Sequence, residues 1–111
     1  ADVFISLHCN AASAGQANGT ECFVFSHWSA SDRLAACIQS QIVNSLGTSD
    51  RGVKEGARLI VLHNTTMPAV LVELAFISND ADCEKLIERK REFAAAIARG
   101  ITDYIAAERG E

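Results

Sequence analysis

Apolar residues recur along the chain at two different spacings, which predict strands and helices in alternation. Residues 2–8, DVFISLH, are rich in β-branched and aromatic side chains and apolar on both faces, as is typical of a central strand covered on both sides. Residues 20–26, TECFVFS, predict a second strand, and residues 57–62, ARLIVL, a third. A fourth strand is predicted at 67–76, where Pro68 is tolerated because it lies near the start.

Three stretches with helical spacing or a capping residue predict helices. Ser31 is the expected N-cap of the first helix, and Gly47 is expected to end it. The apolar stripe of this helix consists of Leu34, Ile38, Ile42 and Leu46. Asn79 is the expected cap of a short second helix, and a longer amphipathic helix follows from about residue 89 to residue 108.

Strands interleaved with helices predict an α/β fold with a mostly parallel central sheet, flanked by helices on both faces. Residues 9–19 and the segment TSDRG at 48–52 are expected to form a loop and a turn. A chain of 111 residues is large enough for one domain with one core.

Composition excludes two classes of partner. The net charge is −4, and the Lys and Arg residues are scattered among Asp and Glu, so we expect no nucleic-acid partner. No apolar run approaches the roughly 20 residues that span a bilayer. The sequence begins with a strand-like segment and has no Met at position 1 and no leader pattern, so we expect an incomplete piece of a longer protein.

The four cysteines contain no CxxC pair, which excludes a zinc ribbon or a thioredoxin-type motif. They are Cys9, Cys22, Cys37 and Cys83. Two disulfides remain possible in an oxidising compartment, but thiols that behave as small buried hydrophobes are favoured.

One carboxylate, Glu73, interrupts the apolar run PAVLVELAF. Burying it without a partner costs several kcal/mol, so it must be either compensated or used. Ligands gather at the carboxyl ends of parallel strands, where His8 and Glu73 would meet if their strands are neighbours. Such a pair suits a metal site in which the imidazole ligates zinc and the carboxylate takes a proton from water. The alternative is a satisfied core histidine and a Glu73 paired with Lys or Arg.

Four motifs, in order, carry a resemblance to a known family: S-x-H-x-N, D-R-G-V-K, V-L-x-N-T-x-M-P and V-E-x-x-F-I-S-N. From Ala1 to about Ala106 the chain resembles the zinc-dependent N-acetylmuramoyl-L-alanine amidases of the bacterial cell wall. The resemblance implies that His8 binds Zn²⁺ and that Glu73 is the catalytic acid and base. It also implies hydrolysis of the amide between N-acetylmuramic acid and L-alanine of peptidoglycan, in the bacterial cell envelope, either periplasmic or secreted.

The glycine-rich turn that carries the family's first zinc-binding histidine, and its later zinc-binding glutamate, have no counterpart here. We therefore expect residues 1–111 to be the C-terminal portion of a single amidase catalytic domain, inactive alone. The alternative is a catalytically inactive module with the same fold that binds peptidoglycan or a partner protein. A cysteine hydrolase using Cys9 or Cys22 is a third reading.

Two further residues are substrate-binding candidates. Asn10 follows His8 by two positions and would contact substrate, unless it serves only the turn. Arg51 would bind a stem-peptide carboxylate, unless it pairs with Asp50. His27 and His63 are expected at the surface or its boundary, and the Cys9 thiol is expected in the core.

Overall fold

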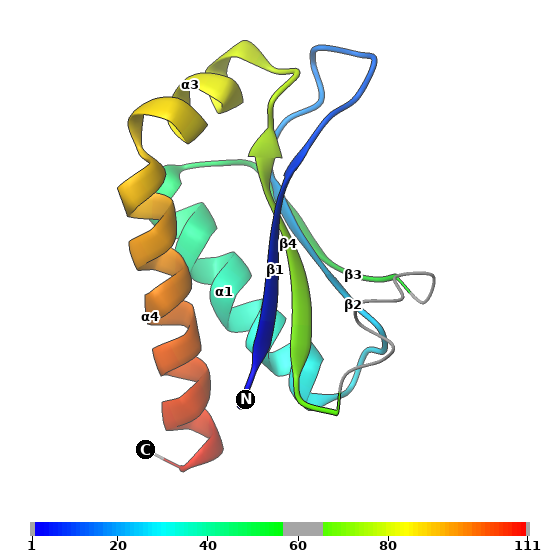
Figure 1. Ribbon diagram of the computed structural model, residues 1–111, viewed down its shortest axis with the longest axis vertical. Helices are drawn as coiled ribbons and strands as arrows, with labels where there is room; N and C mark the ends of the chain where they lie inside the picture. The colour runs from blue at the N-terminus through cyan, green and yellow to red at the C-terminus, as the bar shows by residue number, and fades with distance from the viewer. Residues whose placement is uncertain (1, 57–65, 111) are drawn as a thin grey trace.

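The computed structural model describes residues 2–56 and 66–110, and the strand predicted at 57–62 lies outside them. Four strands and three helices are described (Figure 1). In chain order they are β1 (Phe4–Asn10), β2 (Thr20–Val24), α1 (Ala30–Leu46), β3 (Asp50–Glu55), β4 (Ala69–Phe76), α3 (Asp80–Glu88) and α4 (Lys90–Glu108). None of these helices is long and apolar enough to cross a membrane.

The four strands form one sheet in the order β1-β4-β2-β3. β1 pairs with β4 and β2 pairs with β3 in parallel, whereas β2 and β4 are antiparallel. The prediction of an α/β fold with a mostly parallel sheet is therefore confirmed. β1 was expected at the centre, but within the described residues it pairs with β4 alone and forms an edge, which leaves Leu7 52% exposed.

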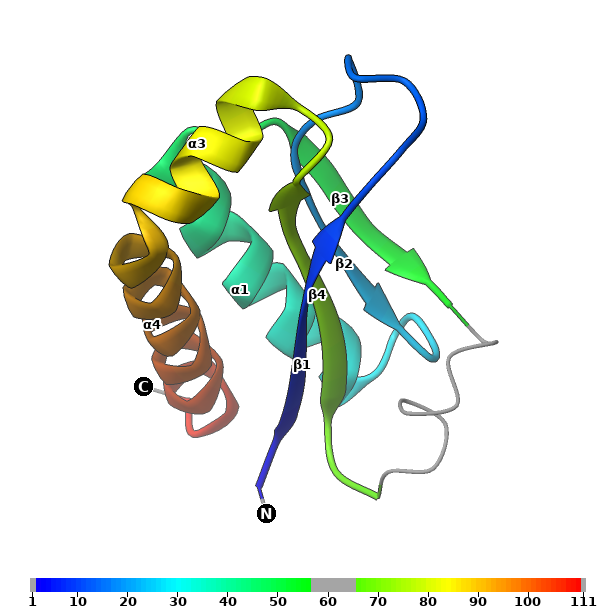
Figure 2. The same ribbon diagram turned by 45° about the horizontal axis from the view of Figure 1, so that its top comes forward.

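The helices described all lie on one face of the sheet, where the prediction placed helices on both (Figure 2). α1 packs against β2, β3 and β4, and α4 packs against α1. Alternate residues of the strands point into this layer, because side chains along a strand alternate between faces. The main core includes Cys22, Val24, Leu34, Ile38, Ile42, Val70, Val72, Phe93 and Ile97.

α1 and α4 approach closely at Gly100. A Cβ added at Gly100 would lie 2.6 Å from the Cα and 2.9 Å from the backbone nitrogen of Ile38. Real Cβ atoms do not come so close to backbone, so a side chain here would force the helices apart. The absence of a side chain at position 100 thus sets the separation of the two helices.

The caps of α1 and α3 agree only partly with expectation. The N-cap of α1 is Ser29, whose hydroxyl accepts from the Asp32 N–H, and not Ser31. The Ser31 hydroxyl instead accepts from the backbone N–H of Ala69 at 2.9 Å, which links α1 to the start of β4. Gly47 ends α1 in the left-handed conformation as predicted. Asn79 caps α3, also as predicted.

The segment TSDRG is not simply a turn, because β3 begins at Asp50 within it. Its charged residues suit an edge strand of the described sheet, which sequence periodicity did not reveal.

Asp82 joins three segments near the end of β4. Asp82 is 4% exposed, and one oxygen of its carboxylate, Oδ2, accepts from the backbone N–H groups of Gly19 at 2.8 Å and Phe76 at 3.0 Å. The start of α3, the residue before β2 and the last residue of β4 are therefore held together by one side chain.

Candidate active site

A row of ionisable side chains crosses the sheet. The parallel register places His8 directly opposite Glu73, and the antiparallel register places Glu73 directly opposite Glu21. Side chains at directly opposed positions project from the same face of a sheet. The apolar positions next to them, such as Val72 and Cys22, point into the main core, so the row lies on the face away from the helices.

Glu73 carries an oxygen without a hydrogen-bond partner. Its Oε2 is enclosed, and nothing within residues 2–56 or 66–110 hydrogen-bonds to it. Burial raises the pKa of this carboxyl, the charge of His8 opposes the rise, and the charge of Glu21 adds to it. No described ion pair includes Glu73, so the alternative in which Lys or Arg compensates it has no support there.

His8 is exposed, so it is not the satisfied core histidine of the alternative reading. The Ser6 hydroxyl lies 2.9 Å from its Nε2, two residues earlier on the same strand. This contact fixes the orientation of the ring, as partners of ligating histidines commonly do. Within the described residues, no group of three or more His, Cys, Asp or Glu could hold a metal ion. The described residues thus place one imidazole beside a carboxylate without an ion-pair partner, which is fewer groups than the three protein ligands of a catalytic zinc site.

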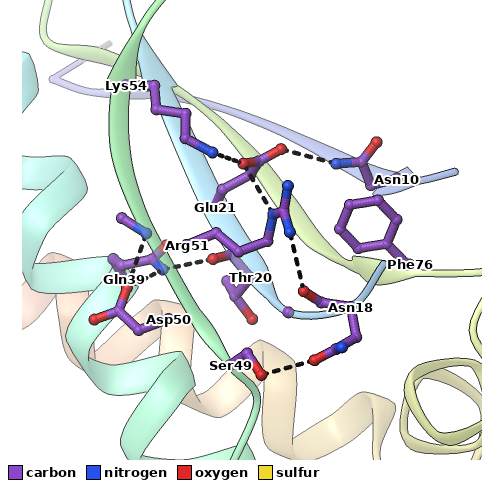
Figure 3. Close-up of polar contacts among 12 residues, drawn as sticks. Asn10, Asn18, Thr20, Glu21, Gln39, Ser49, Asp50, Arg51, Lys54 and Phe76 are labelled. Carbon is purple, nitrogen blue, oxygen red and sulfur yellow. Dashed lines mark hydrogen bonds and ion pairs between the residues drawn. The ribbon is translucent and has the colours of Figure 1, made fainter. Parts of the chain in front are cut away.

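Glu21 accepts hydrogen bonds from both substrate-binding candidates, Asn10 and Arg51 (Figure 3). Its Oε1 accepts from Asn10 Nδ2 at 2.9 Å. Its Oε2 accepts from Lys54 Nζ and from Arg51 Nε, the latter at 3.3 Å. Burial would raise the pKa of Glu21, but the hydrogen bond and charge of Lys54, together with Arg51, hold it below its usual value. These four residues are called the Glu21 cluster below.

Arg51 is held at three points. Besides Glu21, it donates from Nη1 to the Asn18 carbonyl at 3.4 Å, and its guanidinium lies 4.9 Å from the Phe76 ring centroid. The expected alternative partner, Asp50, instead accepts from Gln39 Nε2 and from the Gly52 N–H. Arg51 therefore lies beside Glu21 on the face away from the helices, with its side chain 37% exposed, and the alternative pairing with Asp50 is wrong.

Sequence reasoning missed Glu21, Lys54 and Ser6. Glu21 lies in the strand pattern TECFVFS, where alternation indicates that it shares a face with Phe23. Strand alternation predicts which face of the sheet Glu21 occupies, but it does not predict which residue lies opposite, because the antiparallel register with β4 depends on tertiary structure. Only the register brings Glu21 beside Glu73.

Two other histidines and two cysteines were considered as candidates from the sequence. His27 follows β2, and its Nδ1 lies 3.0 Å from Asp32 Oδ1, while His63 is outside the described residues. Cys9 was expected in the core, but it is exposed, because β1 is an edge strand of the described sheet. Cys22 is buried as favoured, and burial, with the charges of Glu21 and Asp50, raises its pKa to about 12.

Comparison with known families gives one match that spans most of the chain. The model of a family described as N-acetylmuramoyl-L-alanine amidase matches residues 1–103. Among solved structures, the CwlD amidase from Clostridioides difficile, in complex with the GerS lipoprotein, has a TM-score of 0.90 at 30% identity, over 96% of this chain and 56% of that one. The catalytic domain of CwlV from Bacillus (Paenibacillus) polymyxa var. colistinus has a TM-score of 0.78 at 34% identity, over 99% and 59%.

Curated relatives are similar at higher identity. The uncharacterised protein YqiI of Bacillus subtilis (strain 168) is 45% identical over 108 residues, which are 94% of this chain and 52% of that protein. The N-acetylmuramoyl-L-alanine amidase LytC of the same organism is 42% identical over 108 residues, 94% of this chain and 22% of that protein. The chain spans about half the length, or less, of these relatives.

Proposed function

The chain belongs to the N-acetylmuramoyl-L-alanine amidase family, and from this premise we propose that the protein carrying it hydrolyses the amide between N-acetylmuramic acid and L-alanine in peptidoglycan. The observation that carries the proposal is the enclosed Glu73 oxygen without a hydrogen-bond partner, directly opposite His8. Glu73 is half-buried, an enclosed carboxylate oxygen without a partner is costly, and a proton-transfer role accounts for its retention.

His8 would be one ligand of a zinc ion. The Ser6 hydroxyl engages Nε2, and no described contact engages Nδ1, which leaves that nitrogen available to a metal. When bound, zinc would supply Lewis acidity to the amide carbonyl and to the attacking water. A catalytic zinc needs three protein ligands, so the same proposal assigns residues 1–111 to the C-terminal portion of one catalytic domain, whose other part supplies the remaining ligands.

Glu73 would act as the general base and then as the general acid. It takes a proton from the attacking water and returns it to the nitrogen of the leaving L-alanine amine, so the carboxylate is regenerated. Burial raises the pKa of Glu73, and this brings the group closer to the pH at which transfer in both directions is efficient.

Asn10 and Arg51 would contact the substrate from one side of Glu73. Arg51 presents a partly exposed planar cation, which suits a carboxylate of the stem peptide. Asn10 is oriented by its hydrogen bond to Glu21 and is two residues from His8. Because the substrate is peptidoglycan, the protein would act in the bacterial cell envelope, either in the periplasm or after secretion.

The decisive experiment is incubation of the complete protein with purified peptidoglycan, followed by mass spectrometry of the soluble products. Release of stem peptides with a free L-alanine amino terminus supports the proposal. Sedimentation of the protein with peptidoglycan, with no peptide released in the presence of zinc, would instead favour the inactive binding module.

A further inference from the structure

The two carboxylates that face each other across β4 and β2 have unlike surroundings. Glu73 and Glu21 are directly opposed in the antiparallel register, where like charges repel. Glu21 is 5% exposed and accepts hydrogen bonds from Asn10, Lys54 and Arg51 (Figure 3). Oε2 of Glu73 has no such partner among the described residues. Both cations of the Glu21 cluster are therefore held by the carboxylate that is not the proposed base.

We propose that Glu21 is a positioning residue that holds Lys54 away from Glu73 and so leaves the base free of a competing ion pair. This inference rests on the proposed function, because that function assigns Glu73 as the base. Directly opposed residues of an antiparallel pair have Cβ atoms about 5 Å apart. An ammonium group that contacts Glu21 is therefore within a side-chain rotation of Glu73.

Lys54 is the cation that Glu21 must restrain. Arg51 keeps two other contacts, with the Phe76 ring and the Asn18 carbonyl, when Glu21 loses its charge. For Lys54, the contacts described within residues 2–56 and 66–110 give Glu21 alone. Its side chain is 44% exposed and flexible, so it can move toward a new anion.

An ion pair with Lys54 would impair Glu73 as a base for two reasons. An adjacent cation favours the charged carboxylate and lowers its affinity for a proton. The ammonium group would also occupy the oxygen that must accept the proton of water.

Second-site rescue tests this role in the complete protein. Glu21→Gln should lower kcat by about tenfold or more, with KM changed by less than about threefold, because general-base catalysis contributes about 10²- to 10⁴-fold. Adding Lys54→Met to Glu21→Gln should restore most of the lost kcat. If Glu21→Gln lowered kcat only by disturbing the structure, Lys54→Met would not restore it. Glu88→Gln removes the same charge from an exposed position of α3 and should change neither constant.

A crystal structure of Glu21→Gln gives a readout that does not depend on activity. Lys54 Nζ should lie within about 3 Å of a Glu73 carboxylate oxygen. A Lys54 that remains away from Glu73, or a double variant no faster than Glu21→Gln, would overturn the inference. If the wild-type protein releases no peptide, the proposed function fails, but this structure still decides where Lys54 goes.

If Glu21→Gln does not fold, Glu21→Asp provides the test, because it keeps the charge that holds Lys54. A folded Glu21→Asp should retain most of the wild-type kcat. Folded Glu21→Asp with kcat reduced by about tenfold or more, and with Lys54 still on Asp, would overturn the inference, since Lys54 could then not be the cause.

Discussion

His8 and Glu73 occupy directly opposed positions on two paired parallel strands, although they are 65 positions apart in the sequence. The pairing brings an exposed imidazole beside a carboxylate with an enclosed, unpartnered oxygen.

Glu73→Gln is expected to abolish release of stem peptides while leaving the zinc content unchanged. The amide keeps the shape of the side chain but cannot accept a proton from water, so kcat should fall by about 10²- to 10⁴-fold. Peptide release and zinc content are measured on the same sample. Loss of zinc together with activity would make Glu73 a metal ligand and contradict the role proposed for it.

His8→Ala is expected to lower the zinc content of the complete protein, because it removes an imidazole ligand. His27→Ala is the matched control, since His27 lies beside Asp32 at the other end of β2 and should not affect zinc. Atomic absorption spectroscopy after dialysis measures both variants. Full zinc occupancy in His8→Ala would count against this metal site.

A chelator is expected to remove activity, and added zinc should restore it, whereas iodoacetamide at neutral pH should have little effect. Burial raises the pKa of Cys22 to about 12, and burial followed by the charge of Glu73 raises that of Cys9. The reactive thiolate is therefore scarce for both residues. If alkylation inactivated the protein and a chelator had no effect, the result would support the cysteine-hydrolase hypothesis instead.

Gly100→Ala is expected to destabilise the protein by about 1–3 kcal/mol, because the added methyl group would overlap the Ile38 backbone. Urea unfolding measures the change. Gly15→Ala is the control, because its nearest neighbour would be the Ser78 carbonyl at 3.5 Å, an ordinary contact. A more stable Gly100→Ala would show that helix propensity, worth about 1 kcal/mol, outweighs the close approach of the helices.

The ion pairs of Glu21 should contribute stability that is lost in acid. The pKa of Glu21 is held below its unfolded value of 4.5, so the contribution is complete above that pH and disappears as the pH falls through the lower folded value. Unfolding of wild type and Glu21→Gln is compared at neutral pH and in acid. The difference in unfolding free energy should shrink in acid, and a constant difference would contradict the assignment.

Much of the site was predictable because its chemistry depends on strand ends. A carboxylate within PAVLVELAF and a histidine at the end of DVFISLH could be expected to meet, since parallel strands align their carboxyl ends. The apolar stripe of α1 was also predictable from its helical spacing, and its residues Leu34, Ile38 and Ile42 are all fully buried.

The rest depends on pairings that the sequence does not encode locally. Glu21 meets Glu73 through an antiparallel register, and β3 forms from charged residues that have turn-like composition. The position of the first cap was wrong because Ser29 and Ser31 are both good caps, and only the link from Ser31 to Ala69 distinguishes them.

Asp82 makes α3 a mechanical link between the two strands that carry the opposed carboxylates. One oxygen fixes both the residue preceding β2 and the last residue of β4, so both strand ends would lose an anchor at once if this carboxylate were lost.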